Sequence, residues 1–497
     1  MGSQQSTEVL REAIRRALDD DTATIVETHI SVVGFGKDRV LKAKKPQRFE
    51  FVDQTDPEAR RQLCTLEVEL NRRLAPDVYL GVVDLFDCAG HVIDAAVEMR
   101  RLDRRYRLSS LIEDGIEVSS CLADVARQVA GLHAGQDRSP AADREASYEA
   151  VKALWRDGLD QIRPHVGTIV PADEDEQIRH LVWRYLEGRS QLFADRIREG
   201  RAVDGHGDLL ADDIFCEPDG TRAIDCLEFS DRFRLGDGLI DVAFLAMDLE
   251  HRDRPDLARE FLDTYCRLVA DRWPSSLERF YVAYRAHVRA KVGCVRVAQG
   301  DTSRAEQVRS LHHLAVDALT TGRVRLIILG GLPGTGKSTI AAELGARHGW
   351  PVIDSDVIRK QRFGLNPWRR PASHQLPHLY GQASTEATYE ELFDRAEVLL
   401  HHGSSVILDA SWNSAGHRRT ARDLANRTAS DLFEVQCTVS TETAHRRLGE
   451  RVLAASDADQ AVYDDMKSRF DPWPEATLVE TDAKVEESLA EVEHLTA

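Results

Sequence analysis

The feature that most constrains this chain is the stretch Leu329–Thr339, which reads LGGLPGTGKST. Residues 331–338 fit the pattern G-x-x-x-x-G-K-[ST] at every fixed position. The apolar run 324–329 before it suits a buried parallel strand, and the Ala, Leu and Glu of 339–347 favour a helix after it. The pattern therefore predicts a strand, a glycine-rich phosphate-binding loop and a helix, in that order.

In such a loop, glycines let successive backbone N–H groups point inward toward phosphate. Lys337 adds positive charge near the β- and γ-phosphates, and the Ser338 hydroxyl is placed to coordinate Mg²⁺. We therefore expect ATP and Mg²⁺ as cofactors. The residues predicted to contact them are Gly331, Leu332, Pro333, Gly334, Thr335, Gly336, Lys337, Ser338 and Thr339.

Composition narrows the class of protein. The chain has 497 residues, which at about 150 residues per domain allows two to four domains, and a net charge of −19. Nucleic-acid-binding proteins are usually basic, so nucleic acid is not an expected partner. Without an apolar run long enough to span a membrane or a secretory signal, we expect a cytoplasmic protein with no membrane partner. The composition indicates no particular oligomeric state.

Eight cysteines are scattered along the chain without a C-x-x-C pair. In a chain of this length, that spacing predicts reduced and mostly buried thiols in a cytoplasm, and neither disulfides nor a zinc site.

The first hundred residues predict a small sheet flanked by helices. Residues 7–19 have the pattern of an amphipathic helix, whose apolar face should pack on the domain that follows. Residues 24–35 and 39–44 predict two strands around a turn, and 78–86 and 91–99 predict two more. From about 108 to 200 the pattern is mostly helical.

The second predicted strand carries lysines that could bind nucleotide phosphate. Alternation places Lys42 and Lys44 on one face, so either could serve, and we favour Lys42. A solvated edge strand is the other interpretation. The helix predicted over 57–74 carries Glu67 and Glu69, either of which could pair with the strand lysine or face solvent.

Residues 203–249 supply acids in a spacing suited to phosphoryl transfer. The reaction needs a carboxylate within reach of the acceptor hydroxyl, and oxygen ligands for Mg²⁺. Asp208, in His206-Gly207-Asp208, could be the base, while Asp213 and Asp225 could be the metal ligands.

Further on, 281–292 is a basic helical stretch with Arg285, Arg289 and Lys291. We interpret it as a solvated helix face, with an anionic partner as the alternative.

These residues together resemble the aminoglycoside phosphotransferase family of kinase-like enzymes, over about residues 23–315. The resemblance implies a catalytic base at Asp208, a metal ligand at Asp225 and a structural acid at Asp241. It also implies Glu67 as the partner of the strand lysine. Where the family has a metal-binding asparagine, this chain has Asp213. Because aspartate also coordinates Mg²⁺, two interpretations stay open: an active kinase, or a binding or regulatory module.

The C-terminal part alternates predicted strands (350–354, 404–409, 433–439 and 477–480) with helices, after a helical stretch over 255–318 and a polar linker, 319–323. Such alternation predicts a doubly wound parallel sheet. Ligands bind at the carboxyl ends of its strands, where Lys337, Asp356 and Asp409 fall.

Asp409 ends an apolar strand, where an aspartate typically holds Mg²⁺ through water. The next residue is Ala410 and not a water-activating glutamate, which favours transfer to a bound acceptor over hydrolysis. Asp356 is placed to take a proton from that acceptor, or alternatively to cap a helix. Arg359, a turn further along, could hold an anionic group of the acceptor.

Arginines in a lid could stabilise the phosphoryl group in transit. Arg447 and Arg451 are four residues apart and therefore share a helical face. In that position they would lie over the transferring phosphate and stabilise the negative charge that spreads over it. Arg419 is a second candidate for substrate binding.

Residues Leu326–Pro474 resemble the small P-loop kinases that include polynucleotide kinase, gluconate kinase, chloramphenicol phosphotransferase and the zeta toxins. The resemblance rests on the phosphate loop and on the D-x-x-R of Asp356 and Arg359. It implies that the aspartate is the base and that the arginine binds substrate phosphate. The order of the two parts resembles a bacterial fusion family.

The sequence thus predicts a multi-domain α/β protein: an N-terminal helix (1–22), a two-lobed kinase-like domain (23–318, with lobes 23–100 and 101–318) and a P-loop kinase domain (324–497). We expect a bifunctional ATP-dependent phosphotransferase. Its partner would be a small-molecule acceptor with a hydroxyl group, such as a sugar, amino sugar, aminoglycoside-like or nucleotide-like compound. The alternatives are an N-terminal pseudokinase sensor that regulates the second half, and a P-loop half that acts as a nucleotide switch.

Overall fold

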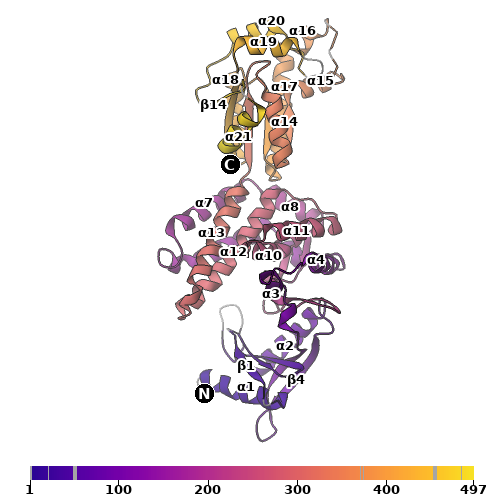
Figure 1. Cartoon of the computed structure of the whole chain (residues 1–497), viewed down its shortest axis with the longest axis vertical. Helices are drawn as coiled ribbons and strands as arrows, with labels where there is room; N and C mark the ends of the chain where they lie inside the picture. Colours follow the sequence, from indigo (N-terminus) through magenta and orange to yellow (C-terminus); the bar gives the residue numbers. More distant parts are fainter. Residues whose placement is uncertain are drawn as a thin grey trace. The chain divides into compact units, whose positions relative to one another are not determined.

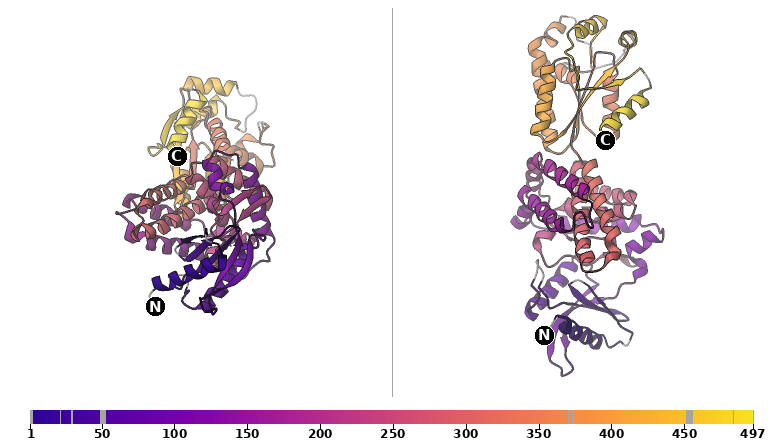
Figure 2. Two further views of the ribbon diagram at one scale, coloured as in Figure 1. Left: turned by 60° about the horizontal axis from the view of Figure 1, so that its bottom comes forward. Right: turned by 90° about the vertical axis from the view of Figure 1, so that its left-hand side faces the viewer.

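The computed structural model describes residues 3–20, 22–28, 30–48, 53–369, 371–372, 374–450, 456–482 and 484–496. The chain divides into two compact units, which are drawn in Figures 1 and 2. The first unit comprises Met1–His165, Arg196–Arg272 and Tyr281–Ala315. The second comprises Val166–Asp195, Trp273–Phe280 and Val316–Ala497. The domain boundaries predicted above stay a prediction.

The first unit begins with a five-stranded antiparallel sheet in the order β1-β2-β3-β5-β4. Its elements are α1 (Ser3–Leu18), β1 (Thr24–Glu27), β2 (Ser31–Phe35), β3 (Arg39–Lys44), α2 (Pro57–Asn71), β4 (Tyr79–Phe86) and β5 (Val92–Arg100). The prediction of one strand over 24–35 is wrong. The Thr28 hydroxyl exchanges hydrogen bonds with the backbone of Ser31, and this turn folds the segment into the hairpin β1–β2.

The two faces of this sheet carry different helices (Figure 1). Leu10, Ile14 and Leu18 of α1 pack on one face, against Val32 and other residues of the sheet, as the amphipathic pattern predicted. Val68 and Cys64 of α2 pack on the opposite face. Because side chains alternate along β3, Lys42 and Lys44 point to the face that α2 covers. The sheet therefore brings both lysines to the helix that carries Glu67.

The rest of the first unit is mainly helical, around the almost wholly buried helix α10. Its elements are α3 (Leu108–Glu113), α4 (Ser119–Ala134), α5 (Pro140–Glu145), α6 (Tyr148–Ile162), β6 (Ala202–Asp204), β7 (Ile214–Glu217), β8 (Gly220–Ala223), α9 (Asp231–Arg234), β9 (Leu235–Asp237), α10 (Gly238–His251), α11 (Pro255–Val269) and most of α12 (Ser275–Ala298) and α13 (Ala305–Thr321). Two small antiparallel pairs, β6–β9 and β7–β8, carry the loops of the candidate site.

The prediction that all cysteines are reduced is wrong at one pair. Cys121 of α4 and Cys216 of β7 form a disulfide, with their Cα atoms 5.8 Å apart. The sequence could not show this pairing, because 95 residues separate the two positions and only the packing of α4 beside the β7–β8 hairpin brings them together. The other six cysteines are free thiols.

The second unit contains a five-stranded parallel sheet in the order β11-β12-β10-β13-β14. Its elements are α7 (Ala172–Glu187), most of α8 (Ser190–Arg198), β10 (Arg325–Gly330), α14 (Lys337–His348), β11 (Val352–Asp354), α15 (Ser355–Arg362), α16 (Leu376–Leu379), α17 (Gln382–His401), β12 (Val406–Asp409), α18 (Ala415–Arg427), β13 (Asp431–Thr438), α19 (Thr441–Gly449), α20 (Gln460–Ser468), β14 (Thr477–Glu480) and α21 (Val485–Thr496). Helices lie on both faces of this sheet (Figure 2), with α14 and α21 packed on one of them. The predicted fold class is confirmed by the two sheets.

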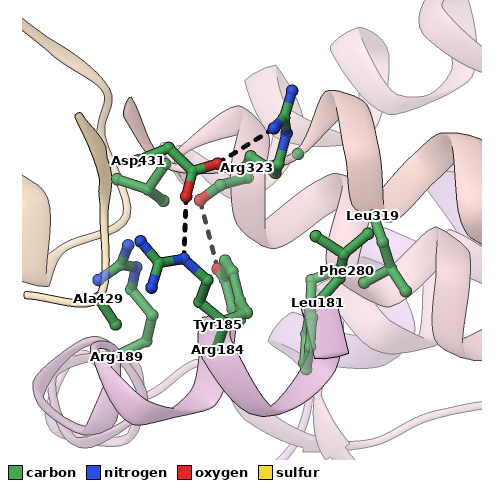
Figure 3. Close-up of a pocket in the computed structure, with 12 residues that line it drawn as sticks. Leu181, Arg184, Tyr185, Arg189, Phe280, Leu319, Arg323, Ala429 and Asp431 are labelled. Carbon is green, nitrogen blue, oxygen red and sulfur yellow. Dashed lines mark hydrogen bonds and ion pairs between the residues drawn. The ribbon is translucent and has the colours of Figure 1, made fainter. Parts of the chain in front are cut away.

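Most of the polar linker predicted at 319–323 is helical, because α13 continues to Thr321. Beside the end of α13, residues of α7, α12, α13 and β13 line a cavity of about 20 Å³, room for roughly one water molecule (Figure 3). Asp431 there accepts ion pairs from Arg184, at 2.9 Å, and from Arg323, at 3.2 Å. The fully buried Arg189 donates to the carbonyl of Thr428. These contacts fasten α7 and the turn after it to the parallel-sheet part of the second unit.

Candidate active sites

The predicted phosphate loop follows β10 and leads directly into α14. Gly331, Gly334 and Gly336 all have positive φ angles, of 139°, 84° and 81°. A Cβ atom on Gly331 would lie 2.5 Å from the Cys437 carbonyl oxygen, and one on Gly334 would lie 2.8 Å from that of Ala444. Only glycine fits these positions, so the backbone can close into a tight cradle. Such a loop at a helix N-terminus fits a bound phosphate chain.

Arg447 of α19 lies against this cradle. Its Nη1 atom lies 3.5 Å from the Gly334 carbonyl oxygen, and its Nη2 atom donates to the Thr481 carbonyl at 2.6 Å. The Thr481 hydroxyl in turn donates to the Thr335 carbonyl at 2.5 Å. The structure therefore brings the predicted lid arginine to the loop, held by a threonine that the sequence did not single out.

Of the other two predicted arginines, the structure describes Arg419 alone. Arg451 lies outside the described residues. Arg419 is exposed on α18. Its neighbour Arg418 is the buried one, and it donates to the carbonyl oxygens of Trp412 and Pro472.

Three carboxylates gather at the carboxyl edge of the parallel sheet. Asp354 and Asp409 end the adjacent strands β11 and β12, and Asp356 follows in the first turn of α15. Asp409 is 3% exposed. Burial, with the negative charges of Asp409 and Asp356, raises the pKa of Asp354 to about 7. Crowded acids that share a proton are typical of a site that binds cations or moves protons.

The alternative interpretation of Asp356, as a helix cap, is wrong. The cap of α15 is Asp354, whose carboxylate accepts from the backbone N–H groups of Asp356 and Val357 at 2.7 Å and 3.1 Å. The reason is a shift of two residues in the helix start, which leaves the Asp356 side chain out of the cap. That carboxylate is 21% exposed.

Arg359 and two tyrosines surround Asp356. The Arg359 Nε atom lies 3.5 Å from Asp356 Oδ1, and its guanidinium lies 4.9 Å from the centre of the Tyr380 ring. Its Nη1 atom donates to the Leu379 carbonyl at 3.3 Å. Tyr389, whose hydroxyl accepts from the backbone N–H of Trp412, completes the group. The result is a polar, aromatic-lined surface around the predicted base.

A buried ion pair holds this surface to the last part of the chain. Lys360 is fully buried, and its Nζ atom lies 3.1 Å from Asp457 Oδ1. The Tyr380 hydroxyl donates to the other oxygen of Asp457 at 3.2 Å. This pair could not be predicted from the sequence, because the two positions are 97 residues apart.

In the first unit, the predicted strand lysine and helix acid meet. Lys42 Nζ lies 2.8 Å from Glu67 Oε1 and 2.5 Å from Asp225 Oδ1. Glu67 is fully buried, whereas Glu69 is exposed, so the structure separates the two candidate acids. Burial acts against the charge on Lys42, but Asp225 and Glu67 hold its pKa well above the usual value.

Lys44 forms a second buried pair that the sequence did not reveal. Its Nζ atom lies 2.5 Å from Glu67 Oε2 and also contacts Glu228. Neither Lys44 nor Glu67 is exposed to solvent, and Glu228 is 5% exposed. Glu67 therefore bridges both lysines of β3. Lys44 was the alternative to Lys42 for binding nucleotide phosphate. Its contacts with Glu67 and Glu228 instead make it part of the buried ion-pair network next to Lys42.

Asp241 fixes the loop that carries the predicted base. Its carboxylate accepts from the backbone N–H groups of His206 and Gly207 at 2.8 Å and 2.7 Å, and contacts His133 Nε2 at 3.1 Å. A Cβ atom on Gly205 would collide with this carboxylate, so the close approach requires glycine. Burial opposes ionisation, but the contacts with His133 and His206 outweigh it and lower the pKa of Asp241. The contacts are those of a structural acid.

Asp208 follows on this loop, with its side chain 34% exposed. Burial raises its pKa, and the nearby Arg289 acts in the opposite direction. Arg289 Nη1 lies 3.9 Å from Asp208 Oδ1. The interpretation of 281–292 as a solvated helix face is wrong for Arg285, which is 4% exposed, whereas the Arg289 side chain is 33% exposed. Arg285 turns inward because α12 packs against α10 there, and its side chain donates to the Ile240 carbonyl at 2.9 Å.

The two predicted metal ligands of this unit differ in environment. Asp225 has a φ angle of +65°, rare for a residue with a side chain, and its carboxylate is engaged by Lys42. The Lys42 charge, the main influence, lowers the pKa of Asp225. Burial, followed by the charges of Asp225 and Asp208, raises the pKa of Asp213 well above its usual value.

These donor sets fit Mg²⁺ only in part. Carboxylate and hydroxyl oxygens are the ligands it prefers, and nucleotide phosphates commonly supply others. Asp213 and Asp225 could hold a cation in the first unit, and Ser338 and Asp409 in the second. Among the described residues, no group of three His, Cys, Asp or Glu side chains forms a metal site alone. The structure also bears on membranes: no helix within the described residues is long and apolar enough to cross one.

Comparison with known proteins gives matches to each part and to the whole chain. Residues 326–473 match a family model described as an AAA domain, which confirms the P-loop resemblance. "Uncharacterized protein Rv2004c" of Mycobacterium tuberculosis and "Uncharacterized protein Mb2027c" of Mycobacterium bovis are each 38% identical over 478 residues, 96% of this chain and 96% of theirs.

Solved structures match each half at lower similarity. A choline/ethanolamine kinase family protein from Mesorhizobium loti is 14% identical, with a TM-score of 0.38, over 64% of this chain and 99% of its own. The Mycobacterium tuberculosis APS kinase CysC, in complex with AMPPNP and APS, is 20% identical, with a TM-score of 0.27, over 35% of this chain and 98% of its own.

Proposed function

The chain belongs to the same family as the two mycobacterial proteins that are 38% identical to it over 96% of its length, and we propose that it catalyses ATP-dependent phosphoryl transfer to the hydroxyl of a small molecule. The observation that carries the proposal is the edge of the parallel sheet, where a phosphate cradle adjoins Asp356, Asp354 and Asp409. A phosphate-binding loop beside a partly exposed carboxylate is what transfer to a hydroxyl requires.

In the second unit, Lys337 and the loop backbone bind the nucleotide phosphates. Asp356 accepts the proton of the acceptor hydroxyl, and Arg359 positions the acceptor. Arg447 stabilises the negative charge that spreads over the transferring group. Ser338 and Asp409 would hold Mg²⁺, which neutralises phosphate charge when bound.

The first unit carries a second site of the same chemistry, so the chain is bifunctional. Lys42 binds nucleotide phosphate and is oriented by Glu67. Asp208 is the base, and Asp225 with Asp213 would hold the metal. Each unit thus has a cation for phosphate, a carboxylate for the acceptor proton and oxygen ligands for Mg²⁺.

A mass-spectrometric screen tests the proposal. The full-length chain is incubated with ATP, Mg²⁺ and a bacterial metabolite extract, and metabolites that gain a phosphate are identified. We expect products with the wild type, and loss of one set with Asp208→Asn and of another with Asp356→Asn. Asp423→Asn, on the exposed side of α18, should keep both sets. The absence of any phosphorylated product with the wild type contradicts the proposal.

The first unit has a second candidate function, a nucleotide sensor that regulates the second unit. Two observations favour it: Asp213 replaces the expected asparagine, and Asp225 is already paired with Lys42. The sensor predicts that a non-hydrolysable ATP analogue binds the full chain at two sites, and that Asp225→Ala removes one. It also predicts that Asp208→Asn changes no product set, which separates the sensor from the kinase.

A further inference from the structure

A positively charged arginine lies beside Asp208, the residue that we propose as the base of the first unit. The Arg289 guanidinium lies 3.9 Å from the Asp208 carboxylate, and its side chain is 33% exposed. Within the described residues, this is the one ion pair of Arg289. A single pair at this distance leaves most of the five N–H donors of an arginine available. A cation with spare donors therefore stands beside the carboxylate that we propose as the base.

Arg289 belongs to a row of arginines along one face of α12. Arg285, Arg289 and Arg296 are four and seven residues apart, which places them on the same face. Arg285 is committed to the fold: it donates to the Ile240 carbonyl at 2.9 Å and lies 4.4 Å from the centre of the Phe244 ring. Arg296 makes no ion pair or hydrogen bond with another described side chain. Two arginines of the row are thus open to a ligand.

Arg296 of this row forms no ion pair with an acid among the described residues. Burial, followed by the positive charges of Arg304 and Arg289, lowers the pKa of Arg296. Asp301 acts in the opposite direction, but its carboxylate already pairs with Arg304 at 2.9 Å. A partly buried positive charge without a paired acid is costly, and a bound anion would reduce that cost. The row is complementary to a negatively charged ligand.

We propose that the acceptor whose hydroxyl gives its proton to Asp208 carries an anionic group, a phosphate or a carboxylate. Arg289 binds this group, and the positive charge of Arg296 adds to the attraction. The inference rests on the proposed function of the first unit and narrows its substrate class to hydroxylated anions. The acceptor oxygen forms the new bond to the γ-phosphorus while its proton passes to Asp208. The bond between the γ-phosphorus and its bridging oxygen breaks, and ADP leaves.

The charge beside Asp208 argues against cationic acceptors, which include the amino sugars and aminoglycoside-like compounds considered from the sequence. An ammonium group would meet Arg289 where it approaches the base, and repulsion of like charges would exclude it. A phosphate or carboxylate would instead form a bidentate pair with the guanidinium, which also fixes its orientation. The anchored anion would position the hydroxyl beside the base.

Direct binding tests the inference. Calorimetry on the full-length chain compares three probes: glycerol, glycerol 3-phosphate and glycerate. We expect at least one anion to bind about tenfold more tightly than glycerol. Arg289→Gln should remove that preference, and Arg289→Lys should restore part of it. Arg309→Gln, an exposed arginine on α13, is the matched control and should change nothing. Stronger binding of the phosphate or of the carboxylate distinguishes the two anions.

Two results would overturn the inference. One is that neither anion binds in an Arg289-dependent way. The other is that the metabolite phosphorylated in an Asp208-dependent reaction is neutral or cationic. The probes are titrated without nucleotide, so their binding does not depend on ATP. The proposed function is tested separately, and it fails if an ATP analogue does not bind the first unit. If Arg289 only keeps Asp208 ionised, Arg289→Gln shifts the pH profile of turnover and leaves the ratio of anion to glycerol affinity unchanged.

Discussion

Asp354 and Asp409 are register partners at the last position of two adjacent parallel strands, β11 and β12. Both carboxylates therefore lie at the edge of the sheet where ligands of such folds bind. Asp354 also caps α15, the helix that carries the proposed base Asp356. It therefore connects the end of β11, this helix and the proposed metal ligand Asp409. Without a cation, burial and the repulsion between the two negative charges raise the pKa of Asp354.

This relationship predicts an unusual pH dependence of stability. The pKa of Asp354 is raised to about 7 from 3.8, so the folded state holds the proton more tightly than the unfolded chain. The contribution of this group is fully present below pH 4 and is lost as the pH rises through 7. Asp354→Asn keeps a helix-capping oxygen and removes the repulsion. In Mg²⁺-free buffer we expect it to stabilise the second unit by roughly 4 kcal/mol at pH 8 and by roughly 1.5 kcal/mol at pH 5.

Chemical denaturation at both pH values measures this difference, with Asp423→Asn as a control on an exposed acid of the same unit. An equal effect of Asp354→Asn at pH 5 and pH 8 would show that the carboxyl is ionised throughout. Addition of Mg²⁺ and ATP should reduce the advantage of the variant, because a cation would then neutralise the charges.

The buried pairs on β3 predict a large effect at Glu67. Glu67→Gln would remove the charge that both Lys42 and Lys44 contact. Breaking a buried pair costs about 3–5 kcal/mol, because the remaining charge stays buried. Glu69→Gln, two residues away but exposed, should change stability by less than about 0.5 kcal/mol. Urea unfolding of the first unit compares them, and similar effects of the two variants would contradict the network.

The sequence predicted those features of the sites that depend on local pattern. The glycines of the loop were readable because their positive φ angles are a property of the backbone at each position. Strand alternation placed Lys42 and Lys44 on one face without separating them, and Asp409 was readable because it ends an apolar strand. In each case, the neighbouring residues along the chain contain the information.

Features that join distant segments were missed. The pair of Lys44 with Glu228 spans 184 residues, and that of Lys360 with Asp457 spans 97. A lysine in a strand or helix reads as a surface residue unless its partner is known, because burial of a charge depends on tertiary packing. Arg285 was read as solvated for the same reason: the helical pattern shows which face of α12 carries the residue but not what packs against that face.

The disulfide predicts a redox-sensitive first unit. Cys121–Cys216 closes a long loop across α4 and β7, a cross-link that typically stabilises a domain by about 2–4 kcal/mol. We expect reduction to lower the melting temperature of the wild type but not that of Cys216→Ser. Alkylation of the denatured chain should modify six cysteines before reduction and eight after it. Eight modified cysteines in the unreduced protein would contradict the bond.

Arg447 and its neighbour Arg446 offer a matched pair for the last prediction. Arg447 contacts Gly334 of the phosphate loop and Thr481, whereas Arg446 is 59% exposed and lies 3.6 Å from Glu450 on the surface. If Arg447 stabilises charge on the transferring phosphoryl group, Arg447→Met should lower kcat by about 10²–10³-fold, the usual cost of one lost donor at a transition state. The affinity for ATP in the ground state should fall far less.

Arg446→Met should leave kcat unchanged, because its ion pair is exposed and contributes little. The measurement is steady-state turnover of the product set that Asp356→Asn abolishes, combined with equilibrium binding of an ATP analogue. A fall in analogue affinity as large as the fall in kcat would show that Arg447 supports the shape of the loop through Thr481 and does not act in the transfer. Equal kcat values for the two variants would exclude α19 from the reaction altogether.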